Sequence, residues 1–176
     1  MLRIEPATES DFEAIYRVIN DAAMAYKGVI PADRWQDPYM PRAELRQHVE
    51  EGERFSCCWE DADVVGVMAI QDKGEVFLVR HAYVCTSHRN QGIGTRLLHE
   101  LTSGLARPVL VGTWKAAEWA IRFYSRNGYH VVPQGDAEVL LGKYWRIPRR
   151  QLETSVVLAD ARYEKTRERL LAGNPK

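Results

Sequence analysis

The sequence predicts a single α/β domain in which a mixed and mostly antiparallel sheet carries helices on both faces. Residues 55–85 consist of short runs of β-branched and aromatic residues separated by turn signals, which is typical of antiparallel strands. From residue 93 to residue 132 helix-like and strand-like patterns alternate, and this order favours a mixed sheet covered on both faces. The length of 176 residues is usual for one domain, and no repeat, low-complexity segment or linker divides the chain. The expected domain therefore covers residues 1–176.

Charge, hydropathy and cysteine content exclude several classes of protein. Lys+Arg and Asp+Glu number 24 each, so no global field draws the chain to nucleic acid or to an anionic membrane. There is no apolar run of about 18 residues, the length of a membrane-spanning helix, and residues 1–15 lack the apolar stretch of a secretory signal. Cys57, Cys58 and Cys85 form neither a disulfide framework nor a CxxC zinc pattern. We expect a cytoplasmic protein without a nucleic-acid partner, a membrane partner or a metal.

The first part of the chain contains two predicted helices and a loop. Ser10 and Glu13 have the spacing of a capping box, and apolar residues at helical spacing follow them to Ala22. Residues 28–41 are rich in proline and aromatic side chains, so we expect a loop that packs like a lid. A second helix is predicted over residues 42–51, and three strands follow, the last of them over 76–85.

The second part alternates helices and strands. Apolar residues after Gly92 predict a helix with one apolar stripe, which Pro108 ends. A helix closed by Gly128 lies between two predicted strands, and a further helix and strand follow before a charged, helical tail. The predicted strands are 109–113, 129–132 and 154–158, and the predicted helices are 116–127, 137–144 and 163–171.

Residues 89–95, Arg-Asn-Gln-Gly-Ile-Gly-Thr, lie between a predicted strand and a predicted helix and have the composition of an anion-binding loop. Successive N–H groups at a helix start bind phosphate, and glycine allows it a close approach to the backbone. Two other phosphate motifs fit less well, because the Walker pattern requires lysine after Gly94 and the dinucleotide fingerprint requires glycine at position 97. A plain strand-to-helix turn is the remaining alternative.

Two segments resemble one known family. Arg89, Gly92 and Gly94 form the pattern R-x-x-G-x-G after a strand, which resembles the acyl-CoA motif of the GNAT acetyltransferase superfamily. Downstream, residues 120–129 are similar to that superfamily's A-x-x-x-Y-x-x-x-G-F/Y segment, which joins a helix to a strand. Together these segments place the motif-bearing core at about residues 76–132, and the flanks resemble the family only in the order of their elements.

The resemblance implies that acetyl-CoA is the co-substrate. The pantetheine arm would pair with the strand edge at Tyr83, Val84 and Cys85, and the amide near Val84 would meet the acetyl carbonyl. The sheet would splay between its central strands, of which one ends near Val84 and the next begins near Val109. The pyrophosphate would lie on the backbone amides of Arg89, Asn90, Gln91, Gly92, Ile93, Gly94 and Thr95.

The resemblance also assigns an acid. Tyr124 matches the position at which the family usually has a tyrosine hydroxyl, so it would protonate the departing thiolate of coenzyme A. Its ring could instead serve only to pack the helix on the sheet. Many members carry an asparagine near the start of this helix that contacts the pantetheine, and this chain has Ala117, so that contact is lost or replaced.

A base is needed as well. A lysine-like amine has a pKa near 10.4, so only about one molecule in 2000 is neutral at pH 7. His81, in the strand next to the cofactor segment, titrates in the right range and is the candidate base, with a structural histidine as the alternative. Arg80 is expected on the opposite strand face. The weaker candidates are Glu75 and the remote His48 and His88.

The acceptor is expected to be the amine of a small molecule or of a protein. Aromatic and apolar residues of the expected lid could form a wall over it, or simply a hydrophobic cap over the sheet. The basic run 146–150 could meet an acidic partner or form a solvated loop, and a homodimer is an open alternative. The residues of the wall would be Tyr26, Trp35, Tyr39 and Met40.

The residues and the resemblance together predict an N-acetyltransferase that moves the acetyl group directly to a primary amine in a ternary complex. No cysteine or serine is recognisably paired with a base, although a route through the thiolate of Cys85 stays open. One alternative is a non-catalytic acyl-CoA-binding sensor or regulatory module. Another is a nucleotide-binding protein that uses residues 89–95 for ATP.

Overall fold

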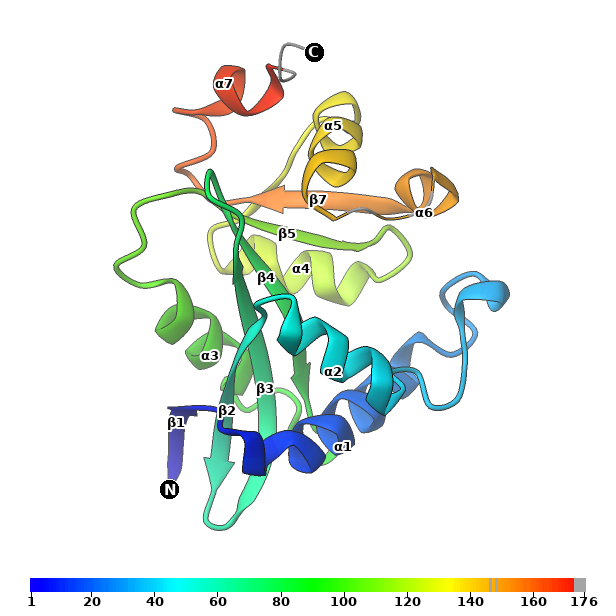
Figure 1. The fold of residues 1–176 in the computed structure, drawn as a ribbon, viewed down its shortest axis with the longest axis vertical. Coiled ribbons are helices and arrows are strands. Elements are labelled where there is room, and N and C mark those ends of the chain that lie inside the picture. The colour runs from blue at the N-terminus through cyan, green and yellow to red at the C-terminus, as the bar shows by residue number, and fades with distance from the viewer. Residues whose placement is uncertain (146, 148, 173–176) are drawn as a thin grey trace. The chain divides into compact units, whose positions relative to one another are not determined.

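The computed structural model describes residues 1–145, 147 and 149–172. Within them, seven strands form a sheet in the order β1-β2-β3-β4-β5-β7-β6 (Figure 1). The chain divides into two compact units, the first made of residues 1–71 and 79–104 and the second of residues 72–78 and those from 105 onward. None of the helices in the described ranges is long and apolar enough to cross a membrane.

The first unit is an antiparallel meander with helices. Strand β2 pairs antiparallel with both β1 and β3. Side chains alternate across β2: Cys57 is buried in the cluster that α1 and α2 form on one face, whereas Cys58 faces the helix that follows the glycine-rich loop. The elements are β1 (Leu2–Pro6), α1 (Phe12–Ala23), α2 (Arg42–Glu50), β2 (Arg54–Glu60), β3 (Asp63–Asp72), β4 (Phe77–Val84) and α3 (Ile93–Thr102).

Gly66 lets α3 approach the sheet. A Cβ atom built on Gly66 would lie 2.7 Å from Cγ2 of Ile93, a side chain that is 1% exposed. We expect Gly66→Ala to lower the free energy of unfolding by about 1–3 kcal/mol, the usual cost of overpacking. Urea unfolding measures this. Gly135→Ala is the control, because its Cβ meets nothing within 4 Å; equal stabilities of the two variants would contradict the prediction.

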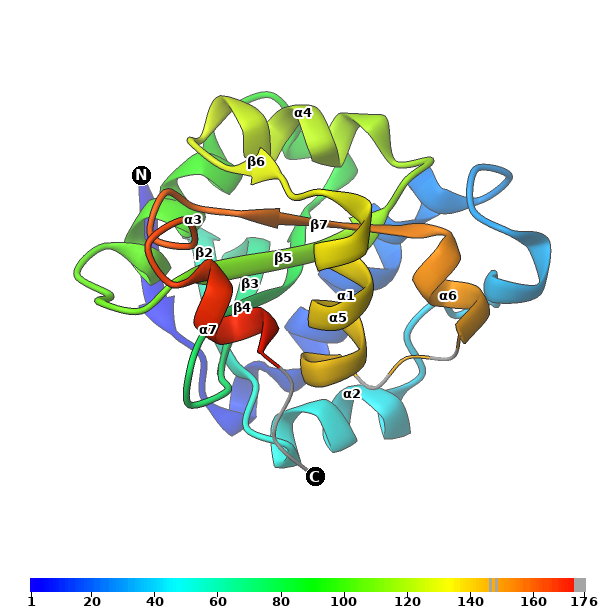
Figure 2. The ribbon, with the colours of Figure 1, turned by 90° about the horizontal axis from the view of Figure 1, so that it is seen from above.

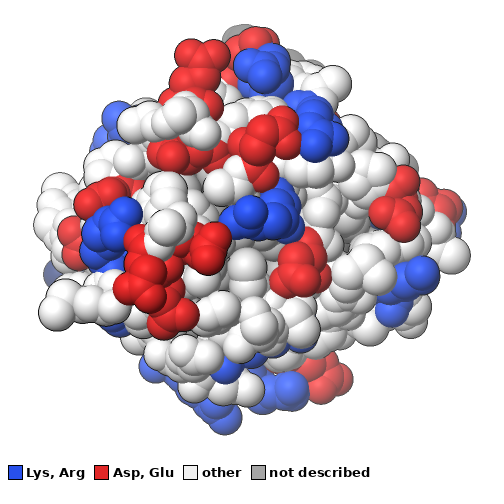
Figure 3. All heavy atoms as spheres, turned by 90° about the horizontal axis from the view of Figure 1, so that it is seen from below, with Lys and Arg blue, Asp and Glu red and all other residues white. Residues whose placement is uncertain are grey.

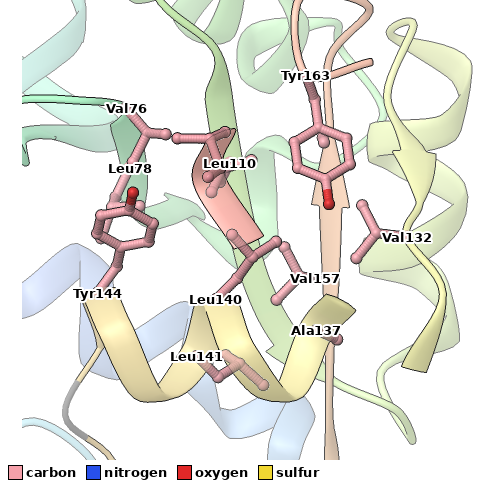
Figure 4. Close-up of a cluster of buried hydrophobic side chains, with 12 residues drawn as sticks. Val76, Leu78, Leu110, Val132, Ala137, Leu140, Leu141, Tyr144, Val157 and Tyr163 are labelled. Atoms are coloured by element: carbon pink, nitrogen blue, oxygen red, sulfur yellow. The ribbon is translucent and has the colours of Figure 1, made fainter. Parts of the chain in front are cut away.

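The second unit has a smaller antiparallel sheet, in which β7 pairs with β5 and with β6. Helix α5 lies on one side of β5 and β7, and α4 lies on the other (Figures 1 and 2). Leu140 of α5 points toward Leu110 and Val157 of the sheet (Figure 4), and Leu141 belongs to the same buried cluster. The elements are β5 (Val109–Trp114), α4 (Glu118–Arg126), β6 (His130–Val131), α5 (Gln134–Tyr144), α6 (Arg149–Glu153), β7 (Ser155–Ala159) and α7 (Arg167–Leu171).

The predicted fold class is confirmed, with local differences. The turn before α1 is closed by Thr8 and not by Ser10, because the amide and the hydroxyl of Thr8 both donate to Oδ2 of Asp11, at 2.7 and 2.8 Å. Strand β1 and helix α6 had no clear signal in the sequence. The single domain and the splayed central strands stay predictions. Acidic and basic side chains are interspersed on the face that Figure 3 shows, as their equal numbers lead one to expect.

Candidate functional site

His81 interrupts the regular backbone of β4. Its φ is +50°, in the left-handed region, which a non-glycine residue seldom adopts. In a regular strand Arg80 and His81 would point to opposite faces, yet both reach the same carboxylate, that of Glu53. The expectation that Arg80 lies on the opposite face from His81 was therefore wrong. The left-handed backbone at His81 breaks the alternation of the strand, so both side chains reach Glu53.

Glu53 is the centre of a compact polar cluster in the first unit. Its side chain is 1% exposed, and its Oε2 lies 2.8 Å from Nε2 of His81. Nδ1 of His48, on α2, lies 2.8 Å from the same Nε2 and 3.5 Å from Oε1 of Glu53. Nη2 of Arg80 lies 3.2 Å from Oε1. We call His48, Glu53 and His81, with Arg80, the histidine–glutamate cluster.

The charges in the cluster are set by competing effects. Burial alone would raise the pKa of Glu53, but the adjacent imidazoles of His48 and His81 and the positive charge of Arg80 outweigh it, so the pKa lies far below the ordinary value. Burial lowers the pKa of His81, and Arg80 and His48 add to this, whereas Glu53 raises it; the net shift is downward. At neutral pH the cluster therefore pairs a charged carboxylate with a neutral His81.

His81 has one nitrogen that the cluster does not use. Nε2 contacts His48 and Glu53, whereas Nδ1 makes no hydrogen bond with any residue that the structure describes. The ring also stacks on Phe55, with centroids 5.5 Å apart and planes 18° apart, so its orientation is fixed. A neutral imidazole bound through Nε2 leaves the lone pair of Nδ1 available to accept a proton.

Two histidines and a glutamate are also residue types that bind transition metals. One ligand atom from each lies within 4.8 Å of the others. Two contacts favour a proton network instead: the nitrogens of His48 and His81 are already hydrogen-bonded to each other, and Arg80 already balances the carboxylate. A divalent cation at Glu53 would meet the charge of Arg80 at close range. The expected absence of a metal stays a prediction.

A row of aromatic rings leads from the expected lid to His81. Trp35 stacks on Tyr39, Tyr39 packs against Tyr26, and Tyr26 meets the edge of Tyr83, with centroid distances of 5.6, 5.5 and 6.4 Å. Tyr83 in turn lies 6.4 Å from the ring of His81. Each of these rings is half-buried, whereas Met40 is 4% exposed and belongs to the core. The aromatic wall thus consists of the rings without Met40.

The loop after β4 is fixed to α1 and ends in a left-handed turn. The amide of Thr86 donates to Oδ2 of Asp21 at 2.6 Å, and Nη2 of Arg89 donates to the carbonyl of Ala22 at 3.2 Å. Asn90 and Gly92 have φ values of +61° and +77°. Left-handed residues before a helix can turn successive amides toward one point, as in an anion-binding nest.

The predicted cofactor residues take different positions in this loop. The amides of residues 89–95 donate no backbone hydrogen bond within the described part of the chain, so they are open to a ligand. Ile93 can contribute only its amide, because its side chain is buried in the core. Val84 and Cys85 are half-buried at the end of β4. Four of the predicted cofactor residues have exposed side chains: Arg89, Asn90, Gln91 and Thr95. Gly92 is also exposed, and Gly94 is half-buried.

Tyr124 belongs to the second unit, in the last turn of α4, and is 5% exposed. Its ring packs against Tyr129 at a centroid distance of 5.8 Å. The carbonyl of Tyr124 accepts from the amide of Tyr129, and that of Ser125 accepts from the amide of Gly128, whose φ is +85°. These two bonds form a Schellman motif, which ends the helix at Arg126 and fixes the backbone of Tyr124.

One residue of the cluster, Glu53, was not predicted from the sequence, and another, His48, was expected to lie far from His81. Glu53 stands at the start of a strand beside Arg54, where a charged residue is expected to be solvated, and nothing in the sequence indicates its burial. His48 was ranked as remote, yet α2 brings it to 2.8 Å from His81. The other weak candidates are engaged elsewhere: His88 lies 3.0 Å from Glu60, and Glu75 accepts from Lys143 and Tyr144. Arg146 and Pro148 of the basic run lie outside the described residues.

Comparison with known proteins identifies the family. The model of the acetyltransferase (GNAT) domain matches residues 20–139. A GNAT-family acetyltransferase from Staphylococcus aureus Mu50 is similar, with 16% identity and a TM-score of 0.68 over 91% of this chain and 98% of that one. Paia N-acetyltransferase from Thermoplasma acidophilum, in complex with coenzyme A, has 14% identity and a TM-score of 0.66 over 91% and 98%.

A third structure, yncA, is a putative acetyltransferase from Salmonella typhimurium with its cofactor acetyl-CoA. It has 21% identity and a TM-score of 0.58 over 76% of this chain and 82% of that one. At these identities the solved structures establish the fold, whereas the domain match spans more than half of the sequence. The chain belongs to the GNAT acetyltransferase family.

Proposed function

We propose that this protein transfers an acetyl group from acetyl-CoA to the primary amine of a small molecule or protein, directly and in a ternary complex. Family membership supports acyl transfer from an acyl-CoA in general. The observation that carries the finer proposal is the free Nδ1 of His81, on an imidazole that the cluster keeps oriented and neutral. An amine acceptor requires a base of this kind, because most of it is protonated at neutral pH.

The reaction combines one acyl transfer with proton transfers at the amine and at the thiolate. Nδ1 of His81 takes a proton from the ammonium group, and the neutral amine attacks the thioester carbonyl. The amide near Val84 donates to the oxyanion, and the carbon–sulfur bond then breaks. The hydroxyl of Tyr124 gives its proton to the thiolate, so that coenzyme A leaves as a thiol, and the second proton lost by the nitrogen restores that hydroxyl. The ammonium and acetyl-CoA thus become an amide, a thiol and one proton, which His81 holds.

In this proposal coenzyme A is bound by backbone amides and not by cationic side chains. Residues 89–95 supply amides, and α3, which has ten residues, adds its N-terminal dipole. The side chain of Arg89 is engaged with Ala22, so its part is to hold the loop on α1. This arrangement agrees with a chain whose charges balance overall.

Cys85 is a poor nucleophile in this setting. Burial raises the pKa of its thiol, and Asp21 adds to the rise, so little thiolate is present at neutral pH. Direct transfer is therefore favoured over an acetyl-cysteine intermediate. Cys57, Cys58 and Cys85 are all free, which suits a reducing compartment such as the cytoplasm. A homodimer stays a prediction that light scattering can test.

The acid and the direct route can be tested together. We expect Tyr124→Phe to bind acetyl-CoA as the wild type does but to lower kcat by about 100-fold or more, because the phenol acts on charge that develops as the thiolate departs. Cys85→Ala should stay active. Thiol release during incubation with acetyl-CoA and an amine panel measures both.

Mass spectrometry of the protein incubated with acetyl-CoA alone is the control. A stable acetylated protein together with an inactive, folded Cys85→Ala variant would overturn direct transfer. If acetyl-CoA binds and no amine elicits thiol release, the protein is an acyl-CoA sensor and not an enzyme.

A further inference from the structure

The histidine–glutamate cluster continues to the protein surface. The side chain of His81 is 8% exposed, that of His48 is 18% exposed, and that of Glu44 is 46% exposed. Nε2 of His48 lies 4.0 Å from Oε1 of Glu44, one helical turn away on α2. The two nitrogens of His48 thus connect different environments: Nδ1 contacts His81 inside, and Nε2 faces a partly solvated carboxylate.

We propose that His48 and Glu44 form a proton exit route, which carries the proton of the acceptor amine from His81 to solvent. The inference rests on the proposed function, since it assumes that His81 is the base. A base buried as deeply as His81 must lose its proton before the next turnover. The hydrogen bond to His48 provides a path by which a proton reaches solvent while the product still occupies the acceptor side.

The transfer balances without a further reactant. Nδ1 of His81 accepts the amine proton, and the proton on Nε2 of His81 moves to Nδ1 of His48 along the 2.8 Å hydrogen bond. The proton on Nε2 of His48 then passes to Glu44, whose Oε1 lies 4.0 Å away, or to bulk water. Each imidazole accepts one proton and releases one, so both end neutral with exchanged tautomers. They are restored after the product has left: Nε2 of His48 takes a proton from solvent, Nδ1 of His48 returns its proton to Nε2 of His81, and Nδ1 of His81 releases its proton to water in the vacated acceptor site.

Glu53 and Arg80 act on this route without carrying the proton. Oε2 of Glu53 is buried and receives no well-directed hydrogen bond within the described residues, although it lies 2.8 Å from Nε2 of His81. It is placed to stabilise the positive charge that passes between the two rings. Arg80 holds the other oxygen, Oε1, and keeps the carboxylate charged. Glu53 is therefore a positioning residue.

Chemical rescue tests the route. We expect His48→Ala to lower kcat at least tenfold, to leave acetyl-CoA affinity unchanged, and to recover activity when imidazole fills the vacated space. His48→Gln should show the same loss without recovery, because its amide fills the space but does not accept and release protons at neutral pH. His130→Ala is the matched control, since His130 also pairs with a glutamate, Glu164 at 3.0 Å, but has no part in the proposed reaction.

A pH profile gives a second measure. Glu53 raises the pKa of His81, so Glu53→Gln should lower that pKa and shift the acid limb of kcat/KM to lower pH. If Glu53 had only a structural role, Glu53→Gln would lower kcat/KM by the same factor at every pH and would not shift the acid limb. The Glu53→Gln variant must be shown by circular dichroism to be folded; if it is not, His48→Gln and Glu44→Gln carry the test alone.

The outcomes separate the two proposals. Wild-type rates in folded His48→Ala and His48→Gln would overturn the exit route and leave the acetyltransferase proposal standing. If His48→Ala has a lower kcat and imidazole does not restore it, the route is also overturned, because the role of His48 would then be only structural. Absence of thiol release from the wild type with every amine would instead remove the proposed function on which the route depends.

Discussion

Asparagine in place of His81 is expected to lower kcat/KM for the amine by about 10²–10⁴-fold, the usual contribution of a general base, with acetyl-CoA affinity retained. Asparagine is chosen because it tolerates the left-handed region, whereas alanine would add backbone strain at the φ of +50°. The effect should therefore report the loss of the base and not a change of fold. Thiol release at several amine concentrations, with calorimetry for acetyl-CoA, measures both quantities.

The pH dependence of the wild type provides the accompanying check. His81 must be neutral to accept a proton, so activity falls as the pH drops through its pKa. Since burial, Arg80 and His48 together lower that pKa below 6.5, the acid limb should lie below the range of an ordinary histidine. In His81→Asn this limb should vanish. A wild-type rate in the asparagine variant, or an unchanged acid limb, would show that the base is another group.

Gly92→Asp should weaken coenzyme A binding by about 10–1000-fold. A carboxylate placed about 4 Å from a phosphate costs on the order of 1–4 kcal/mol at the dielectric constants found near protein surfaces. Gly92→Asn is the matched control, because it has the same size and tolerates the φ of +77° equally well, but carries no charge.

Calorimetric titration with coenzyme A distinguishes these cases once both variants are shown to be folded. If aspartate and asparagine weaken binding equally, the cause is steric and the amides do not form an electrostatic site. If neither weakens it, the pyrophosphate lies away from residues 89–95. Only a large gap between the two variants supports the proposed anion nest.

Local patterns in the sequence were enough to predict the fold class and the position of the glycine-containing loop before α3. The glycines of the loop act through backbone geometry, which depends on neighbours in the chain, and Gly92 does adopt the positive φ that such a loop needs. Helix α4 likewise ends at Gly128, as its position after the last helical residue predicts. Both features depend on a few consecutive residues.

The histidine–glutamate cluster could not be predicted in the same way. Glu53 and His81 are 28 positions apart, and their contact depends on the pairing of strands and on one unusual backbone angle. His48 lies on α2, a helix in which most residues are exposed. Nothing in the sequence of this helix indicates that the imidazole points inward. Burial of a charged residue is decided by what packs around it, and that information lies in the whole sheet and not near the residue.

The left-handed backbone at position 81 restricts which residues can replace the histidine over evolutionary time. Glycine, asparagine and aspartate tolerate such a φ, whereas branched residues such as valine or isoleucine are strongly disfavoured there. A descendant of this protein that had lost catalysis but retained its fold would therefore be expected to carry glycine, asparagine or aspartate at this point. If His81 is the base, as proposed, those residues would mark, in a sequence alone, relatives that keep the fold but have lost the reaction.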